Sequence, residues 1–307
     1  MIEQARLAEE AGFDWLVLGD RHAWEPGFHE ALTTLTWLAA HTRRIGLATA
    51  GLILPLYPPV LLAEALANVD VLSGGRLTAG FVLGYRPEEF AAFQTAPSRR
   101  VALFEEGLEI VKRLWCEGRV TVSGRHHRLT DVRIAPLPVQ RPRPRIWGAG
   151  RVEAAIRRTA RLCDAWMSSF NEEPAELEGK IRVYREAPVS QGSLGKMVVA
   201  CRDGFCARDA GAARRIYEGP AVELFRAYAG WKRTSPDAAR YRDLRWEALT
   251  GRLLVGGAQE LVEGIRAYEA MGCDALVLRV QPPGLPQAEA MRCLELLGER
   301  VLPAFAE

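Results

Sequence analysis

Apolar residues in this chain gather in short runs that are separated by longer amphipathic segments. Seven runs, rich in Leu, Val, Ile and Ala and without polar alternation, lie at 15–18, 45–54, 77–83, 145–147, 165–168, 197–201 and 275–280. Runs of this kind are typical of strands in a parallel sheet that is buried on both faces. Helical periodicity fills the segments between them, so strands and helices alternate along the chain. The pattern predicts an α/β fold.

This alternation predicts a TIM-type (β/α)₈ barrel, and an open doubly wound sheet is the alternative. The alternative is disfavoured because the turn at 148–150 has Glu153 where a dinucleotide fingerprint requires its third glycine. A closed barrel of this type needs eight strands, whereas the pattern contains seven. The chain begins with a helical segment that would follow the first strand, so we expect that strand to be missing from this sequence, in a segment upstream.

We predict a single domain over 1–307 with two parts outside the repeat. Residues from about 118 to 144 include a stretch that alternates around Gly124 and predicts a small hairpin. Residues from about 207 to 250 are mostly helical in pattern. Because strands and helices continue to alternate on either side of each part, both are predicted to be insertions in one barrel.

Composition excludes several classes of protein. The 40 Lys and Arg residues nearly balance the 38 Asp and Glu residues, so charge indicates no nucleic-acid or anionic-membrane partner. No apolar run approaches the roughly 20 residues of a membrane span. The N-terminal segment is an amphipathic helix rather than a targeting signal, and the six cysteines contain no CxxC pair, which predicts a cytoplasmic protein without structural disulfides. Five histidines without an HxH or HExxH motif predict no metal site.

Residues that follow the strands are the candidates for chemistry, because active sites of such barrels lie at the carboxyl ends of the strands. Asp20 and His22 follow the run at 15–18 and could orient a substrate or exchange a proton. The structural alternative is a capping aspartate with solvated neighbours. The turn at 148–150 opens a helix, so it is either a phosphate-binding turn or only a tight connection. Ser168 and Ser169 offer hydroxyl donors after another strand.

Several segments together resemble the bacterial luciferase-like flavin monooxygenases, almost from end to end of the chain. The segments that carry the resemblance include AEEAGFDWLVLGDRH, PPVLLAEALANVDVLSGGRLTAGFVLGYRPEEF, GRHHRLTDVRIAPLPVQRPRPRIWGAG and LLVGGAQELVEGIRAYEAMGCDALVLRVQPPG. The resemblance implies a (β/α)₈ barrel with a reduced flavin across the carboxyl end of the strands. It also implies that some members carry a non-proline cis peptide at the position of Gly51-Leu52.

The resemblance assigns roles to individual residues of this chain. Asp20 and His22 are the implied catalytic residues. Family members often have His directly after the acidic residue, where this chain has Arg21, so whether Arg21 replaces a catalytic histidine stays open. The implied cofactor-binding residues, with Gly150 and the two serines serving the phosphate, are Thr49, Gly51, Leu52, Gly84, Tyr85, Gly148, Gly150, Ser168 and Ser169.

The function implied is that of a monooxygenase that takes reduced FMN from a separate flavin reductase and uses oxygen on a small organic substrate. A homodimer is implied as well. The alternative is a reductase or dehydrogenase that depends on the deazaflavin coenzyme F420. The loop Ser-Ser-Phe-Asn-Glu-Glu after the run at 165–168 favours FMN, because Lys and Gly there would suit the longer, more anionic F420. A second alternative is an inactive or non-binding barrel paralogue.

Overall fold

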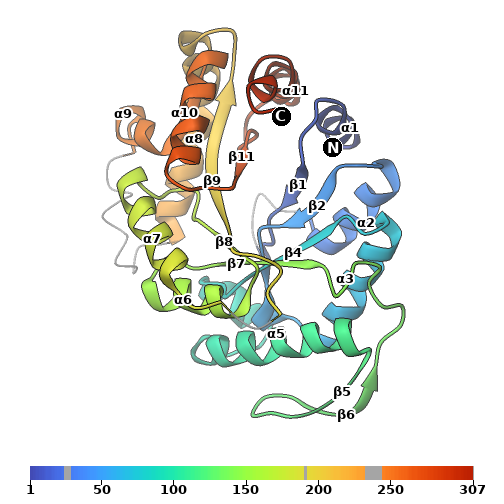
Figure 1. The fold of residues 1–307 in the computed structure, drawn as a ribbon. Helices are drawn as coiled ribbons and strands as arrows, with labels where there is room; N and C mark the ends of the chain where they lie inside the picture. The colour runs from blue at the N-terminus through green and yellow to red at the C-terminus, as the bar shows by residue number, and fades with distance from the viewer. Residues whose placement is uncertain (24–28, 190–191, 232–243, 307) are drawn as a thin grey trace.

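The structure of this protein is a computed structural model that describes residues 1–23, 29–189, 192–231 and 244–306. Its centre is a curved parallel sheet of strands that pair in the order β1 (Trp15–Leu18), β2 (Gly46–Thr49), β4 (Leu77–Val82), β7 (Arg145–Ala149), β8 (Ala165–Met167), β9 (Met197–Cys206) and β11 (Ala275–Arg279). Figure 1 shows this sheet curving into a barrel with helices around it. The predicted barrel of seven strands is confirmed.

Helices cover the outer face of the sheet. They are α1 (Ile2–Glu10), α2 (Ala31–His41), α3 (Pro59–Ser73), α4 (Pro87–Ala92), α5 (Arg100–Glu117), α6 (Glu153–Leu162), α7 (Pro174–Glu186), α8 (Ala210–Trp231), α9 (Trp246–Leu249), α10 (Ala258–Ala270) and α11 (Gln287–Leu296). Two apolar clusters fill the space between helices and sheet, and a third, around Trp147 and Met167, fills the barrel interior. The described part of the chain includes no helix that is long and apolar enough to cross a membrane.

The barrel is open between β1 and β11. Among the described residues, β1 pairs only with β2 and β11 only with β9. Every residue of these two strands is partly exposed, whereas every residue of β8 is buried. Beyond the opening, α1 and α11 contact each other (Figure 1). The unfilled eighth place of the barrel is therefore the place between β1 and β11.

The predicted strand at 45–54 is broken in the structure. After β2 the peptide bond between Ala50 and Gly51 is cis, one bond before the expected position, and a short strand β3 (Leu52–Ile53) then pairs with the end of β4. The backbones of β2 and β4 approach closely at Gly80, where a Cβ atom would lie 1.8 Å from the carbonyl oxygen of Thr49. A continuous strand is therefore the wrong prediction here. The backbone swings outward around Gly80 and turns Gly51 toward the barrel mouth.

Two features lie outside the seven-strand order, one predicted and one not. The predicted hairpin is present as the antiparallel strands β5 (Arg119–Ser123) and β6 (Arg128–Arg133). Strand β10 (Leu253–Gly256), which the sequence pattern did not predict, pairs with residues 203–206 of β9. Because β9 is ten residues long, its carboxyl half extends past β8, and β10 pairs with it there. Helix α7 was also missing from the sequence-based prediction.

Candidate active site

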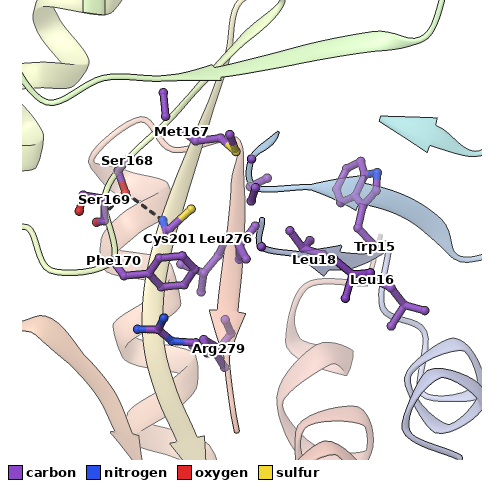
Figure 2. A pocket seen from close by; sticks show the side chains of 18 of the residues that line it. Trp15, Leu16, Leu18, Met167, Ser168, Ser169, Phe170, Cys201, Leu276 and Arg279 are labelled. Atoms are coloured by element: carbon purple, nitrogen blue, oxygen red, sulfur yellow. Dashed lines mark hydrogen bonds between the residues drawn. The ribbon is translucent and has the colours of Figure 1, made fainter. Parts of the chain in front are cut away.

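A large cavity lies at the carboxyl ends of the strands and continues into the opening between β1 and β11. Its volume is about 2090 Å³. Figure 2 shows Trp15, Leu16 and Leu18 of β1 on one side of this cavity and Leu276 and Arg279 of β11 on the other. Seven of the residues predicted from the sequence line it, namely Asp20, Gly51, Gly84, Tyr85, Gly150, Ser168 and Ser169.

Asp20 is held by three hydrogen-bonding groups at the end of β1. Its Oδ1 lies 3.1 Å from Nε2 of His22, and its Oδ2 accepts from the hydroxyl of Tyr57 at 3.0 Å and from the backbone N–H of Ile53 at 2.9 Å. Only about 1% of the Asp20 side chain is exposed, so these contacts replace most of its hydration. The three donors therefore satisfy both oxygens of this buried carboxyl group.

His22 lies behind Asp20 and outside the cavity lining. Its backbone N–H donates to Oε1 of Glu89 at 3.1 Å, and its backbone carbonyl accepts from Arg86 at 3.1 Å. The ring of Phe93 packs on its imidazole at 4.7 Å between ring centroids. The hydrogen bond to Asp20 raises the pKa of His22 above its usual value and outweighs the opposing effect of burial. Helix α4 and its flanks therefore fix His22 against Asp20.

The segment between β2 and β4 presents main chain to the cavity. Gly51 and Ile53 line it, whereas Thr49 and Leu52 face away. The hydroxyl of Thr49 donates to the carbonyl of Gly80 and accepts from the N–H of the same residue, both at 2.8 Å. Leu52 is fully buried in the core between sheet and helices. The role of Thr49 and Leu52 as flavin contacts thus stays a prediction. The geometry supports a structural role for both side chains, which hold the bulge formed by residues 50–53.

Gly84 lies at the turn where the chain leaves β4. Its φ is +72°, a conformation that other residues rarely adopt, and a Cβ atom here would lie 2.6 Å from Cγ2 of Ile53. The turn places the side chain of Tyr85 at the cavity mouth, where the tyrosine hydroxyl accepts from Arg21 at 3.2 Å. The side chain of Arg21 therefore lines the cavity mouth, whereas His22 lies behind Asp20, outside the cavity lining.

Guanidinium groups and aromatic rings alternate along one wall of the mouth. The guanidinium carbon of Arg21 lies 5.9 Å from the ring centre of Tyr85 and 5.8 Å from that of Tyr228. Arg279 continues the series, at 5.6 Å from Tyr228 and 4.4 Å from Phe170. The sequence pattern did not single out Tyr228, because it belongs to the α8 insertion and carries no signal of its position. Arg279 is paired with the buried carboxylate of Asp203, at 2.5 Å and 2.8 Å, which balances its charge. The wall is flat and polarisable, which suits planar groups.

Another part of the cavity lining has features that suit a phosphate. Gly150 and Arg151 lead from β7 into the first turn of α6, whose N–H groups point toward the strand ends. Ser168 and Ser169 follow β8 beside them, and the Ser168 hydroxyl accepts from the N–H of Cys201 at 2.9 Å (Figure 2). Arg151, which the sequence analysis did not name, has its Nε 3.6 Å from the buried carboxylate of Glu172.

Gly148 is the fourth predicted residue outside the cavity lining, with His22, Thr49 and Leu52. A Cβ atom at Gly148 would lie 2.7 Å from Sγ of Cys163 and 2.8 Å from Cγ2 of Thr159. The glycine therefore allows α6 to pack closely on β7. Its predicted contact with the cofactor remains a prediction, and its position supports a packing role.

Metal and thiol chemistry have little support in this cavity. The described residues contain no group of three His, Cys, Asp or Glu side chains that could hold a metal ion. All six cysteines are free thiols. Cys201 and Cys273 line the cavity, and burial raises their pKa values to about 12 and about 11, so both thiols stay protonated near neutral pH. The site therefore depends on hydrogen bonds, aromatic surfaces and charge.

A parallel (β/α) barrel with a large cavity at the carboxyl ends of its strands has the architecture of an enzyme active site. The profile of the luciferase-like monooxygenase family matches residues 1–275. This protein belongs to that family, as its sequence motifs predicted.

Comparison with individual proteins supports the same class. Monooxygenase RslO1 from Streptomyces bottropensis superposes with a TM-score of 0.86 and 30% identity, over 99% of this chain and 94% of that one. The oxygenase component of the flavin-dependent trigonelline monooxygenase of Acinetobacter baylyi is 25% identical over 100% of this chain and 89% of its own length. The FMNH₂-dependent dimethylsulfone monooxygenase of Pseudomonas putida is 30% identical, over 54% of this chain and 47% of its own.

Deazaflavin enzymes are also relatives of this chain. The F420-dependent glucose-6-phosphate dehydrogenase of Kineococcus radiotolerans is 35% identical, but over 43% of this chain and 42% of its own length. The relatives that match the chain over nearly its whole length thus include flavin-dependent monooxygenases, and F420 enzymes lie further away. The predicted enzyme class, a flavin-dependent oxidoreductase, is confirmed at this level.

Proposed function

We propose that this protein is a monooxygenase that uses reduced FMN and molecular oxygen to oxidise a small organic substrate. The observation that carries the proposal is that two kinds of surface line one cavity. A phosphate-compatible turn lies at Gly150 and Arg151, and a wall of guanidinium groups and aromatic rings lies at Arg21 and Tyr228. The turn would hold the phosphate of FMN, and the wall would offer a surface to planar groups of the cofactor or the substrate.

The residues of this site fit FMN by their chemistry. The first turn of α6, the guanidinium of Arg151 and the hydroxyls of Ser168 and Ser169 would hold the phosphate. Gly51 and Gly84 leave room for the ring system, because neither carries a side chain at the cavity surface. When bound, reduced FMN supplies the activation of oxygen.

The protein's own residues supply position and electrostatics. Asp20 lines the cavity and holds the main chain of Ile53 in place. His22 keeps a proton on Nε2 toward Asp20, since a carboxylate can only accept a hydrogen bond. In this assignment Asp20 and His22 order the site, and the apolar barrel interior around Trp147 and Met167 excludes water from it.

Titration with the two cofactors tests this function. We expect purified protein to bind reduced FMN under anaerobic conditions, seen as a fluorescence change and a rise in melting temperature. Oxygen should then yield an oxygenated product from a suitable substrate. Tight binding of reduced F420 with no response to FMN would contradict the proposal and support a reductase or dehydrogenase. Binding of neither would support an inactive or non-binding paralogue.

The finer features expected from the sequence complete the proposal. We infer a homodimer, a flavin reductase as the source of reduced FMN, a cytoplasmic location and one domain over residues 1–307 with its two insertions. Exposed apolar side chains on α2 and α3, among them Trp37, Leu61 and Leu72, support a surface for self-association. Light scattering of the purified protein would show a mass near that of two chains. A monomer at micromolar concentration would contradict the dimer.

A further inference from the structure

Tyr57 is a residue that neither the family motifs nor the cavity lining brings to attention. It follows a short 3-10 turn (Leu54–Leu56) that begins directly after Ile53. Its hydroxyl donates to Oδ2 of Asp20 at 3.0 Å and lies 3.3 Å from Nε2 of His22. The ring itself is half-buried and packs edge-on to the imidazole, at 5.9 Å between centroids.

The same oxygen of Asp20 binds both ends of this 3-10 turn. Oδ2 accepts from the N–H of Ile53 at 2.9 Å and from the hydroxyl of Tyr57. Ile53 closes the bulge that carries Gly51 to the cavity, and both residues line that cavity. Asp20 therefore links the loop after β1 to the bulge after β2, and Tyr57 fixes the direction of its carboxylate.

The phenol is suited to this task because it stays a donor. Burial and the neighbouring Asp20 charge raise the pKa of Tyr57 above its usual value, so the hydroxyl keeps its proton across the physiological range. Hydrogen bonds from a neutral donor to a carboxylate are stronger than those between two neutral groups. The other donors to Asp20 are a ring nitrogen that titrates and a backbone N–H. The phenol supplies a contact that does not change with pH near neutrality.

We propose that Tyr57 is a positioning residue of the flavin site, which acts through Asp20 to hold the Gly51–Ile53 bulge in the shape that contacts the cofactor. The last step of this inference rests on the proposed flavin function. The first step, from Tyr57 through Asp20 to Ile53, concerns the protein alone and is tested without cofactor.

The test is the full-length Tyr57→Phe variant, which removes one oxygen atom and keeps the ring. We expect the amide proton of Ile53 to exchange about tenfold faster than in the wild type, with little change in the strands β7 and β8. We expect the dissociation constant for reduced FMN to rise by about tenfold. Unchanged exchange at Ile53 in a folded variant would overturn the proposal.

A matched control is Tyr184→Phe. Tyr184 is a fully buried phenol in the layer between helices and sheet, and its hydroxyl has no hydrogen-bond partner among the described residues. Its loss should change neither the exchange at Ile53 nor the affinity for reduced FMN. If both tyrosine variants weaken FMN equally, the effect is general loosening of the fold, and the proposal fails.

The double variant Tyr57→Phe/Asp20→Asn separates positioning from structural support. If Tyr57 acts through Asp20, the double variant binds reduced FMN as weakly as Asp20→Asn alone, because the two changes break the same link. Additive losses would contradict the proposal. If the wild type fails to bind reduced FMN but Ile53 responds to Tyr57→Phe, the proposed function fails and the link from Tyr57 to the bulge stands.

A measurement on the wild type tests the hydrogen bond should the variants not fold. The hydroxyl proton of Tyr57 should exchange slowly enough with water to be observed in the NMR spectrum of labelled protein. Its absence, with the spectrum otherwise that of a folded protein, would overturn the proposal.

Discussion

Arg143 and Asp164 form a buried two-point ion pair that joins the segment before β7 to the turn before β8. The two terminal nitrogens of Arg143 lie 2.6 Å and 2.9 Å from the two oxygens of Asp164. Asp164 also accepts from the backbone N–H groups of Ile146 and Leu194, so its carboxylate is fully used inside the protein. This pair lies at the amino ends of β7 and β8, away from the cavity mouth at their carboxyl ends, and sets the relative position of the two strands.

Asp164→Asn should destabilise the fold by about 3–5 kcal/mol, because it leaves the buried guanidinium of Arg143 without its counter-charge. Denaturant unfolding followed by circular dichroism measures the change. The control is Glu117→Gln, which breaks the exposed pair with Arg113 at 2.9 Å and should cost less than about 1 kcal/mol. Equal losses in the two variants would show that the buried pair has no special weight.

Acid should remove the same contribution. Burial alone would raise the pKa of Asp164, but the hydrogen bonds and charge of Arg143 outweigh it and hold the pKa below its usual value. A group with a lowered pKa contributes stability that is complete above its unfolded value, about 3.9, and is lost as pH falls through its folded value. In Asp164→Asn the loss of stability in this acid range should therefore be smaller than in the wild type.

His22 should report the charge of Asp20. Its pKa is raised chiefly by the hydrogen bond to Asp20, while burial opposes the rise. Asp20→Asn removes the largest raising effect and leaves burial opposed only by the more distant charges of Glu89 and Glu30, so the pKa of His22 should fall. NMR titration of the imidazole protons measures it. In the wild type, the stability from His22 is complete below about pH 6.5 and is lost as pH rises through its raised folded pKa. An unchanged titration in the variant would exclude the Asp20–His22 contact.

Arg151→Gln should weaken reduced FMN by about 10- to 100-fold and leave reduced riboflavin unaffected, because only FMN has a phosphate. Fluorescence titration under anaerobic conditions compares the two ligands. Arg157→Gln, on the exposed side of α6 and paired with Glu153 at 2.7 Å, is the matched control and should bind both flavins as the wild type does. Equal weakening of FMN and riboflavin by Arg151→Gln would place Arg151 away from the phosphate.

Gly84→Ala should lower the free energy of unfolding by about 1–3 kcal/mol, since its φ of +72° and its closeness to Ile53 leave no room for a methyl group. Thermal and denaturant unfolding measure the loss. Gly179→Ala is a useful contrast: it lies within α7 with open space around it, and should stabilise the protein by about 0.5–1 kcal/mol. A neutral Gly84→Ala would mean that the turn after β4 tolerates a shift.

The open side of the barrel should be visible in hydrogen exchange. The carbonyls of Asp14 and Leu18 bond to the β2 side, so the alternate residue Val17 directs its N–H toward the opening. By the same alternation, Asp274 donates to β9 and Val277 faces the opening. We expect the amides of Val17 and Val277 to exchange faster than those of β8. Equal protection throughout would show that another part of the protein covers these edges.

The sequence by itself determined the barrel. Buried parallel strands need apolar side chains on both faces, and this requirement leaves the same mark at all seven strands whatever surrounds them. It also indicated Asp20, Gly51, Gly84 and the two serines, because a residue that follows a strand lies at the carboxyl end of the barrel by topology alone. The strand β10 escaped because four residues are too few to show a period. Helix α7 does carry a helical signal, with Leu177, Ile181 and Tyr184 buried at helical spacing, so it could have been predicted.

Only the tertiary structure decided which of these residues face the cavity. The alternation of a strand would put Thr49 and Gly51 on the same face, but the break at the Ala50–Gly51 bond turns the first into the core and the second to the mouth. Tyr57 and Tyr228 reach the site from a 3-10 turn and an inserted helix, and no local pattern relates them to Asp20 or Arg21. Strand positions follow from local hydrophobicity, whereas side-chain partners depend on how distant segments pack, and that information lies in contacts rather than in spacing.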